Sequence, residues 1–234
     1  MKFDDSLNES AADSQGMAAM AGSVSYMEGK VGRAVSIGAG NDNYIDLGNR
    51  PDLKFGNDSF TVSFWHAGNL KGDQTIISNK DWNSEGNIGW YIGPRVANAM
   101  SLNMGNGSGG RIDMDAASVG TEWHHFTISV DRAAGSAQIY VDGTEQASIS
   151  LAPIGTSSMD TANNIILGAD GRKKYGDASV TLDELKIWNH SLSDEEAVAL
   201  SDSYKAETVY YTHEQLSPKQ RTSLPLFRTR QACH

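Results

Sequence analysis

The sequence predicts an all-β protein in which two antiparallel sheets pack as a sandwich, with one short helix near the C-terminal end. Three observations carry this prediction. Glycine is frequent, at 24 of 234 residues, which interrupts the chain too often for long helices. Short segments alternate apolar and polar residues with a period of two, and Gly, Asn and Asp turns separate them. Residues 123–143 have the pattern of a complete strand-turn-strand unit.

Twelve segments have the period-two pattern of strands, at the spacing typical of a sandwich. They lie near residues 34–37, 44–47, 60–66, 74–78, 89–92, 100–104, 111–114, 123–130, 137–141, 146–150, 164–167 and 180–189. Phe60, Val62 and Phe64 would share one face of their strand, and residues 180–189 are apolar on both faces. These two segments are therefore expected to be core strands.

The turns and the helix have local signals of their own. The strand that begins at Trp123 is followed by a turn at residues 133–136, and Asp142-Gly143 is a typical hairpin turn. Ser193 and Glu196 have the spacing of a capping box, in which the serine side chain accepts from the backbone N–H three residues later. A helix is therefore expected to begin after Ser193.

Length and composition favour one sandwich domain over residues 1–203. A chain of this size buries enough apolar surface without disulfides, which agrees with its single cysteine, Cys233. Residues 204–234 contain two prolines, an excess of basic residues and no sustained hydrophobic period. They are therefore expected to be an extended tail, a linker or sequence left over from cloning. No apolar run reaches the roughly 18 residues of a membrane helix, so membrane insertion is not expected.

The charge of the predicted domain is strongly negative. Residues 1–204 carry 14 basic and 27 acidic side chains, a net charge of −13. Nucleic acids and anionic membranes are disfavoured as partners, because phosphate recognition depends on basic patches. The charge favours neutral ligands or bound cations, although a merely solvating acidic surface remains an alternative.

Several segments resemble one known family in order and spacing. They are Phe3-Asp4-Asp5, residues 29–35, Tyr44-Ile45-Asp46-Leu47, residues 60–65, Trp123-His124-His125, Tyr140-Val141-Asp142-Gly143, Ile166-Leu167-Gly168 and residues 182–189 before Leu192-Ser193. This set resembles the laminin G-like domains of the concanavalin A-like lectin and glucanase superfamily, which includes the pentraxins. The resemblance implies a jelly roll over residues 3 to about 203 and an extracellular or cell-surface location. Because this scaffold carries lectins, enzymes and adhesion modules, function has to be argued from the site.

A polar loop at residues 79–87 is the first candidate site. Asn79, Asp81 and Asn83 place oxygen-bearing side chains at alternate positions, where they could face one side of an extended loop. Carboxylate and amide oxygens are the ligands that Ca²⁺ prefers. The loop therefore predicts a calcium site, and an ordinary polar surface loop is the alternative.

The resemblance to pentraxins implies where calcium would bind. Their ligand-bound calcium lies at one edge of the concave sheet, and Asp73 and Asp170 occupy the matching positions here. Ala169 replaces a further acid of that family, so a two-calcium cluster is not expected. Several jelly-roll sugar-binding modules instead hold a structural calcium, which here would join Asp4 or Asp5 to Asp183.

Aromatic and planar polar residues near the loop predict a sugar ligand. A pyranose stacks its C–H face on an aromatic ring and offers hydroxyls to amides and guanidinium groups. The candidate ligand-binding residues are Trp82, Trp90, Tyr175, Arg111, Asn83 and Asn103. Burial in the core is the alternative for both tryptophans of this set, and Trp65, Trp123 and Trp188 are expected to pack in the scaffold.

No catalytic motif is recognisable. A glycosidase needs two carboxylates that face one bond, and Asp113 and Asp115 lack the third acid of the jelly-roll glucanase motif. His124 and His125 are adjacent on a strand and therefore point to opposite faces. The sequence thus favours a non-catalytic, calcium-dependent or calcium-stabilised carbohydrate-binding module from a larger protein. A calcium-dependent protein-binding adhesion module is the second hypothesis, and a jelly-roll polysaccharide hydrolase or lyase is the third.

Overall fold

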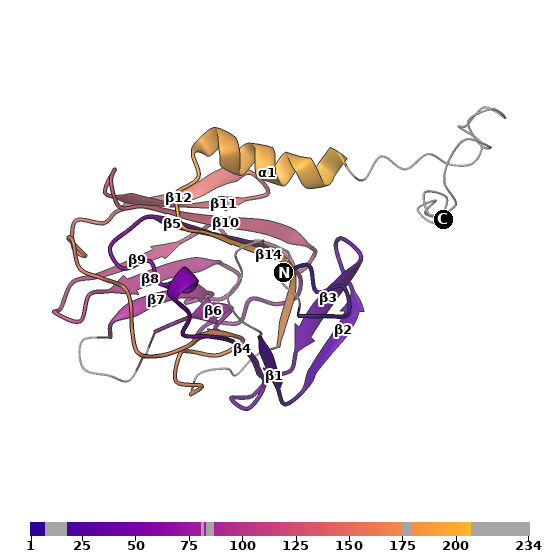
Figure 1. The fold of residues 1–234 in the computed structure, drawn as a ribbon. Helices are drawn as coiled ribbons and strands as arrows, with labels where there is room; N and C mark the ends of the chain where they lie inside the picture. The colour runs from indigo at the N-terminus through magenta and orange to yellow at the C-terminus, as the bar shows by residue number, and fades with distance from the viewer. Residues whose placement is uncertain (8–17, 81, 83–86, 175–178, 207–234) are drawn as a thin grey trace.

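The computed structural model describes residues 1–7, 18–80, 82, 87–174 and 179–206, and these residues form a two-layer β-sandwich (Figure 1). The first sheet, here called the site sheet, has the strand order β1-β4-β13-β6-β7-β8-β9. The second sheet has the order β12-β11-β10-β5-β14-β3-β2 and is called the helix sheet, because the helix α1 lies on its outer side. Neighbouring strands pair antiparallel throughout both sheets of the described residues. The prediction of an all-β, two-sheet antiparallel sandwich with a short C-terminal helix is confirmed.

The elements follow one another along the chain as β1 Ala19–Ala21, β2 Val24–Glu28, β3 Arg33–Ile37, β4 Tyr44–Gly48, the 3₁₀-helix η1 Pro51–Leu53, β5 Phe60–His66, β6 Ile77–Ser78, β7 Gly89–Gly93, β8 Ser101–Gly105, β9 Arg111–Asp115, β10 His124–Asp131, β11 Ser136–Val141, β12 Thr144–Ser150, β13 Ile165–Leu167, β14 Val180–Trp188 and α1 Asp194–Ala206. Each of the twelve predicted strands corresponds to one of these. The prediction missed β1 and β2, which are edge strands with largely exposed side chains and therefore lack an apolar alternation.

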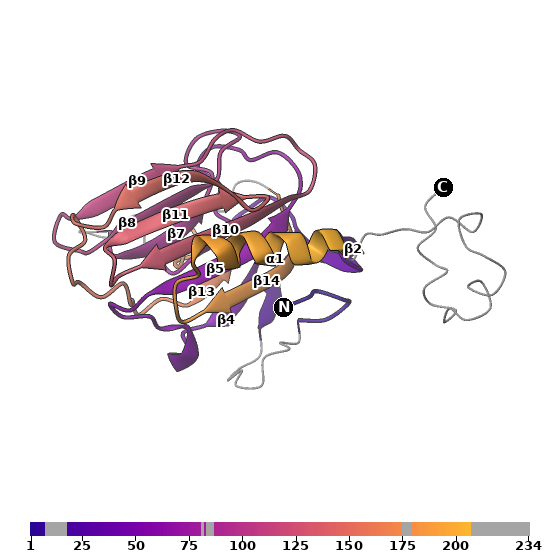
Figure 2. The same cartoon turned by 90° about the horizontal axis from the view of Figure 1, so that it is seen from above.

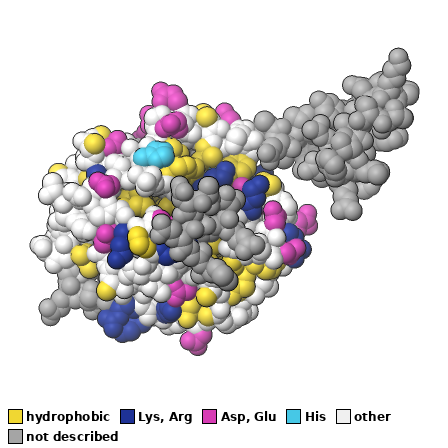
Figure 3. All heavy atoms as spheres, in the orientation of Figure 1, with side chains coloured by type: hydrophobic (Ala, Val, Ile, Leu, Met, Phe, Trp, Pro, Cys, Tyr) yellow, Lys and Arg dark blue, Asp and Glu magenta, His cyan; other side chains and the backbone are white. Residues whose placement is uncertain are grey.

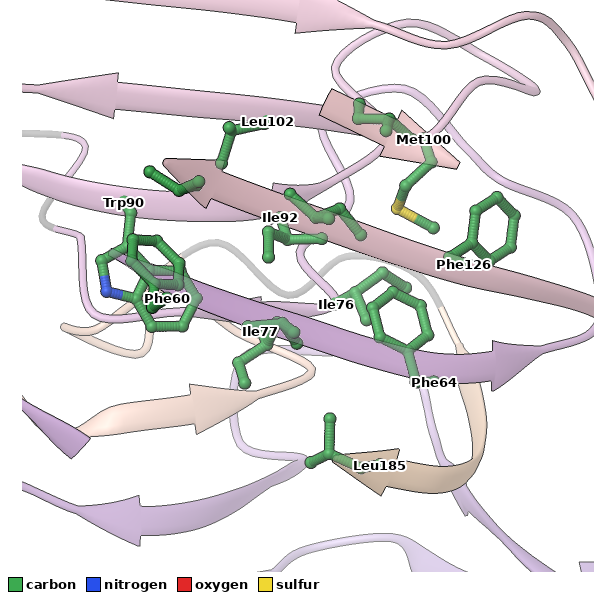
Figure 4. Packing of buried hydrophobic residues seen from close by; sticks show 14 of the residues in the cluster. Phe60, Phe64, Ile76, Ile77, Trp90, Ile92, Met100, Leu102, Phe126 and Leu185 are labelled. Atoms are coloured by element: carbon green, nitrogen blue, oxygen red, sulfur yellow. The ribbon is translucent and has the colours of Figure 1, made fainter. Parts of the chain in front are cut away.

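The core lies between the two sheets and is rich in aromatic and branched side chains (Figure 4). Phe60 stacks on Phe55 with a centroid separation of 4.5 Å, and Trp90 lies 5.3 Å from Phe60. Phe64 packs against Phe126 at 5.8 Å, and both come from central strands of the helix sheet. The apolar residues at every second position of β5 thus lie on its inward face and pack in the core, as the period of two predicts.

The predicted hairpin of residues 123–143 is present in the register that its turns require. Phe126 pairs with Val141 and Asp131 pairs with Ser136 across β10 and β11. Asp142 and Gly143 have φ values of 53° and 82°, the left-handed pair that a two-residue hairpin turn needs. His124 and His125 point to opposite faces: the His124 ring lies 6.4 Å from Phe126, whereas His125 lies 5.2 Å from Trp65.

Helix α1 begins with the predicted capping box. The backbone N–H of Glu196 donates to Ser193 Oγ at 3.3 Å, and the Ser193 N–H donates to Glu196 Oε2 at 2.9 Å. These two bonds satisfy groups that would otherwise lack partners at the helix start.

Replacing Ser193 by alanine is expected to lower the free energy of unfolding by about 1 kcal/mol, because the cap is lost. Thermal unfolding should show this as a drop of about 2–4 °C in Tm. Ser203→Ala is the matched control, since Ser203 lies in the same helix and its hydroxyl donates only to the Leu200 carbonyl. An equal effect of the two substitutions would contradict a capping role.

The helix extends past the predicted domain boundary. α1 runs to Ala206, and Tyr204 is buried against Trp65 at 5.6 Å and His125 at 5.2 Å. Figure 2 shows the helix lying across the helix sheet over β10, β5 and β14. Residues 204–206 therefore belong to the folded domain and not to the tail, while residues 207–234 lie outside the described residues.

No helix in the described part of the chain is long and apolar enough to cross a membrane.

Candidate functional site

The outward face of the site sheet carries the cluster of candidate residues. Trp90, Ile92, Leu102 and Met104 are buried in the core, so the residues that alternate with them on β7 and β8 point outward. Gly89 and Gly105 occupy two of these outward positions and pair with each other across the strands. This glycine pair leaves a strip of the sheet without side chains.

Lys80 fills that strip. A Cβ atom placed on Gly105 would come within 2.9 Å of Lys80 Nζ, and one on Gly89 would come within 3.2 Å of Lys80 Cα. The glycines therefore make the room in which this lysine lies, and its exposed fraction is 0%. Within the described residues, its Nζ has no hydrogen-bond partner. Burial and, to a smaller extent, the nearby Arg111 charge lower the pKa of Lys80 to about 7, against the opposing effect of Asp113.

Trp82 lies above the lysine and is half-buried. Its ring meets Tyr91 edge-on, with centroids 5.0 Å apart, and Lys80 Nζ lies 5.3 Å from its centroid. The guanidinium of Arg111 also faces this ring at 5.6 Å. The Tyr91 hydroxyl is turned away and donates to the Gln74 carbonyl at 2.6 Å. Two cationic groups thus share one partly exposed aromatic ring.

A network on β8 and β9 holds Arg111 in place. Arg111 donates to both carboxylate oxygens of Asp113 at 2.8 Å, and Asn103 Nδ2 donates to Asp113 Oδ1 at 2.8 Å. Burial acts to raise the pKa of Asp113, but the hydrogen bonds from Arg111 and Asn103 hold it below its usual value. Asn103 Oδ1 is buried and has no partner in the described part of the chain. The Asn103 amide oxygen is therefore the one acceptor of this network that has no hydrogen bond within the described residues.

Trp90, predicted as a possible sugar-binding residue, is a core residue. Its exposed fraction is 1%, and it packs against Phe55 and Phe60. The period of β7 places it on the inward face, because Tyr91 takes the outward one. The core alternative was therefore the correct one for Trp90.

Three of the residues predicted to hold calcium, Asn79, Asp73 and Asp170, are among those that the structure describes. Asn79 is buried, with Nδ2 donating to the Met159 carbonyl at 2.9 Å and Oδ1 accepting from Trp90 N at 2.8 Å. Both polar atoms of this amide therefore hold the end of β6 to its neighbours, and Asn79 as a calcium ligand stays a prediction. Asp73 is exposed in the turn before β6, with φ at 62°.

Asp170 is buried after β13, and its Oδ1 accepts from Lys174 N at 2.6 Å. The chain turns back there, so that Gly171 N donates to the Lys80 carbonyl at 2.8 Å. Asp81, Asn83 and Tyr175 lie outside the described residues. Among the residues that the structure does describe, no group of three or more His, Cys, Asp or Glu side chains is placed to hold a metal ion.

A second acidic cluster joins the first segment to β14. Asp183 is fully buried, and its Oδ2 accepts from Val31 N at 2.8 Å while its Oδ1 accepts from Glu184 N at 2.8 Å. Burial, with smaller contributions from the charges of Glu184 and Asp4, raises the pKa of Asp183 to about 7, although the hydrogen bonds from Val31 and Glu184 oppose this rise. Asp5 turns away from this cluster to pair with Arg33 at 3.1 Å. Asp4 is therefore the acid of the first segment that acts on Asp183.

Lys80 is the residue that sequence reasoning missed. It stands inside the polar loop 79–87, but only the oxygen-bearing residues of that loop suggested a ligand. The glycines at positions 89 and 105 were the signal in the sequence. They could not be connected with Lys80 from the sequence alone, because their pairing depends on the register of β7 and β8.

Comparisons with known proteins agree with the fold. A family model described as "Concanavalin A-like lectin/glucanases superfamily" matches residues 39–198. No curated protein sequence matches this chain significantly. Among solved structures, the binding domain of Paraclostridial Mosquitocidal Protein 1 superposes with a TM-score of 0.68 at 20% identity, covering 80% of this chain and 47% of that one.

Two further similar domains have been solved in complexes. The binding domain of botulinum neurotoxin DC in complex with SialylT has a TM-score of 0.63 at 18% identity over 82% of this chain and 48% of that one, and the same domain is also known in complex with rat synaptotagmin II. Domain 4 of AbnA, an extracellular arabinanase from Geobacillus stearothermophilus in complex with arabinotriose, has a TM-score of 0.63 at 20% identity over 86% of this chain and 95% of that one. This chain spans about half the length of the toxin domains and nearly all of the arabinanase domain.

Proposed function

This chain belongs to the concanavalin A-like lectin/glucanases superfamily, and on that premise we propose that it is a non-catalytic carbohydrate-binding module whose ligand packs on Trp82. The module would be part of a larger secreted or cell-surface protein and would be stabilised by calcium. The similarity to a domain of an arabinanase that binds arabinotriose, and to a toxin domain that binds SialylT, supports the class of ligand.

The observation that carries the proposal is the half-buried Trp82 ring beside groups that form hydrogen bonds. Arg111 is 45% exposed at its side chain and faces the ring, while Asn103 supplies a buried amide oxygen on the neighbouring strand. An aromatic face next to a planar donor and a planar acceptor is what a sugar ring requires, because its C–H face is apolar and its hydroxyls both donate and accept.

The acids beside this ring are engaged in ion pairs, which supports a non-catalytic role. Asp113 is bound by Arg111 and Asn103, and Asp115 is bound by Arg95 and by Ser101 Oγ at 2.7 Å. A glycosidase needs one carboxyl with a raised pKa as its general acid, whereas the pKa of Asp113 is lowered. Turnover of a bound polysaccharide would instead support the hydrolase or lyase hypothesis.

A protein-binding adhesion module is the second candidate. It is supported by the likeness to the toxin domain that is known with both a glycan and a protein partner. A glycan array probed with and without calcium separates the two candidates, because only a carbohydrate-binding module gives glycan-specific signals.

Trp82→Ala is expected to weaken binding of an array-positive glycan by about 1–3 kcal/mol, roughly 5- to 150-fold, since the stacking surface is lost. Titration calorimetry with that glycan measures the change. The Tm should hardly move, because the ring is only half-buried. Trp123→Ala is the control, since Trp123 is also half-buried but precedes β10 in the other sheet. Unchanged affinity in the Trp82 variant would place the ligand elsewhere.

A further inference from the structure

We propose that the sugar taken by this site is acidic, with the carboxylate of a uronic acid residue bound by Lys80 and Arg111 while the ring packs on Trp82. This inference rests on the proposed carbohydrate-binding function and adds the chemical class of the ligand.

The amine of Lys80 is buried and has no hydrogen-bond partner among the described residues. A lysine is almost never fully buried without a partner, because removing its charge from water is costly. Lys80 has an exposed fraction of 0%, and its Nζ has neither a hydrogen bond nor an ion pair in the described part of the chain. Asp113 is the acid that acts on it, and that carboxylate already accepts two bonds from Arg111 and one from Asn103. The described residues therefore supply no free anion for this amine.

The Lys80 side chain extends along the site sheet toward Arg111. Its side chain crosses Gly89 and reaches Gly105, whose strand partner on β9 is Arg111. The amine thus ends beside a second cation, and both groups face the Trp82 ring at 5.3 and 5.6 Å. Two neighbouring positive charges repel each other, and an anion held between them removes that repulsion. The glycine strip makes this placement possible, because a Cβ at position 105 would collide with Nζ.

Asn103 and Trp82 favour a sugar acid over a simple anion. Asn103 Oδ1 is a buried acceptor without a partner in the described residues, so it needs a donor such as a hydroxyl. Trp82 offers an apolar face, which an inorganic anion cannot use. A uronic acid combines the required groups in one ring: a carboxylate for the two cations, hydroxyls for the amide and a C–H face for the indole.

The negative net charge of the protein does not prevent an anionic sugar from binding to Lys80 and Arg111. Figure 3 shows acidic and basic side chains interspersed over the visible face, with no single acidic patch. Charges further away than about 8 Å are largely screened at physiological ionic strength. The contacts made by Lys80 and Arg111 therefore decide the preference.

The test compares each uronate with its uncharged form. Oligogalacturonate, oligomannuronate and hyaluronan oligosaccharides are titrated against the protein by calorimetry, each with free carboxyls and as the methyl ester. We expect at least one acid to bind about tenfold or more tightly than its ester, the size of one well-placed charged hydrogen bond. Lys80→Met should remove most of that preference. Lys205→Met is the control, because Lys205 is exposed on helix α1, and it should keep the preference.

Lys80→Met is checked for folding by its thermal transition. Arg111→Gln provides a second variant at an exposed position, and it should also reduce the preference for the acid. Equal binding of acids and esters by the unmodified protein would overturn the inference, as would a preference that survives both substitutions. If only neutral glycans bind on the array, the acidic class is wrong and the proposed function stands. If no glycan binds at all, the proposed function fails and this inference fails with it.

Discussion

Replacing Trp90 by alanine should lower the free energy of unfolding by about 3–5 kcal/mol, the usual loss for a fully buried tryptophan. Its ring lies between the two sheets, 5.3 Å from Phe60 and 6.1 Å from Phe55. The cavity would open in a part of the core where aromatic rings from β5, β7 and the segment before β5 meet. Urea denaturation measures the loss as a lower midpoint at constant m-value.

Trp188→Ala is the matched control for this experiment. The sequence predicted Trp188 as a packing residue, but the structure leaves it half-buried at the end of β14. Its truncation should therefore cost clearly less than that of Trp90. If Trp90→Ala instead kept the stability and reduced glycan binding, the tryptophan would be part of the site and not of the core.

Local patterns predicted most of the fold because strands with one buried face repeat every two residues. β5 has the predicted bounds, and both the Asp142-Gly143 turn and the Ser193 cap have the expected geometry. β6 is shorter than predicted: only Ile77–Ser78 pairs with the neighbouring strands. The tail boundary was misplaced because the burial of Tyr204 depends on Trp65 and His125, which are distant in sequence.

The site was harder to predict because residue type does not tell which face of a strand is inside. β7 is buried at every position, so Trp90 and Tyr91 could not be assigned to a face from their sequence alone. Asn79 was predicted as a ligand from its amide oxygen alone, whereas in the structure Oδ1 accepts from Trp90 N and Nδ2 donates to the Met159 carbonyl, 80 residues further along the chain. Trp82 and Arg111 were predicted from their chemistry, and the structure brings them together. Lys80 depends on the pairing of two glycines, which is a tertiary property.

Calcium stabilisation is part of the proposed function, and the sequence predicts a structural ion that joins Asp4 or Asp5 to Asp183. Asp183 is fully buried, and the charges of Asp4 and Glu184 act on it. Glu184 Oε1 is buried without a hydrogen-bond partner in the described residues, although no group of three or more His, Cys, Asp or Glu side chains there is placed to hold a metal ion. Buried like charges destabilise a fold unless a cation or a proton neutralises them. Calcium, with its preference for oxygen ligands, would join the first segment of the chain to β14.

Adding calcium at about 100 times its dissociation constant should therefore stabilise the domain by about 2.7 kcal/mol relative to chelated protein. Thermal unfolding in excess CaCl₂ and in excess EDTA measures the difference. Asp183→Asn keeps the shape of the side chain and removes its charge, so it should make the Tm nearly independent of calcium.

Asp202→Asn is the matched control, because Asp202 is 57% exposed at its side chain and pairs with Lys205 on the outer helix. This variant should respond to calcium as the unmodified protein does. Two results would contradict the proposal: a Tm that exhaustive chelation leaves unchanged, or a calcium response that persists in Asp183→Asn. The second result would move the ion to another set of oxygen ligands. The Trp82 variant should keep the full calcium response in either case, because its ring lies on the site sheet and Asp183 lies on the helix sheet.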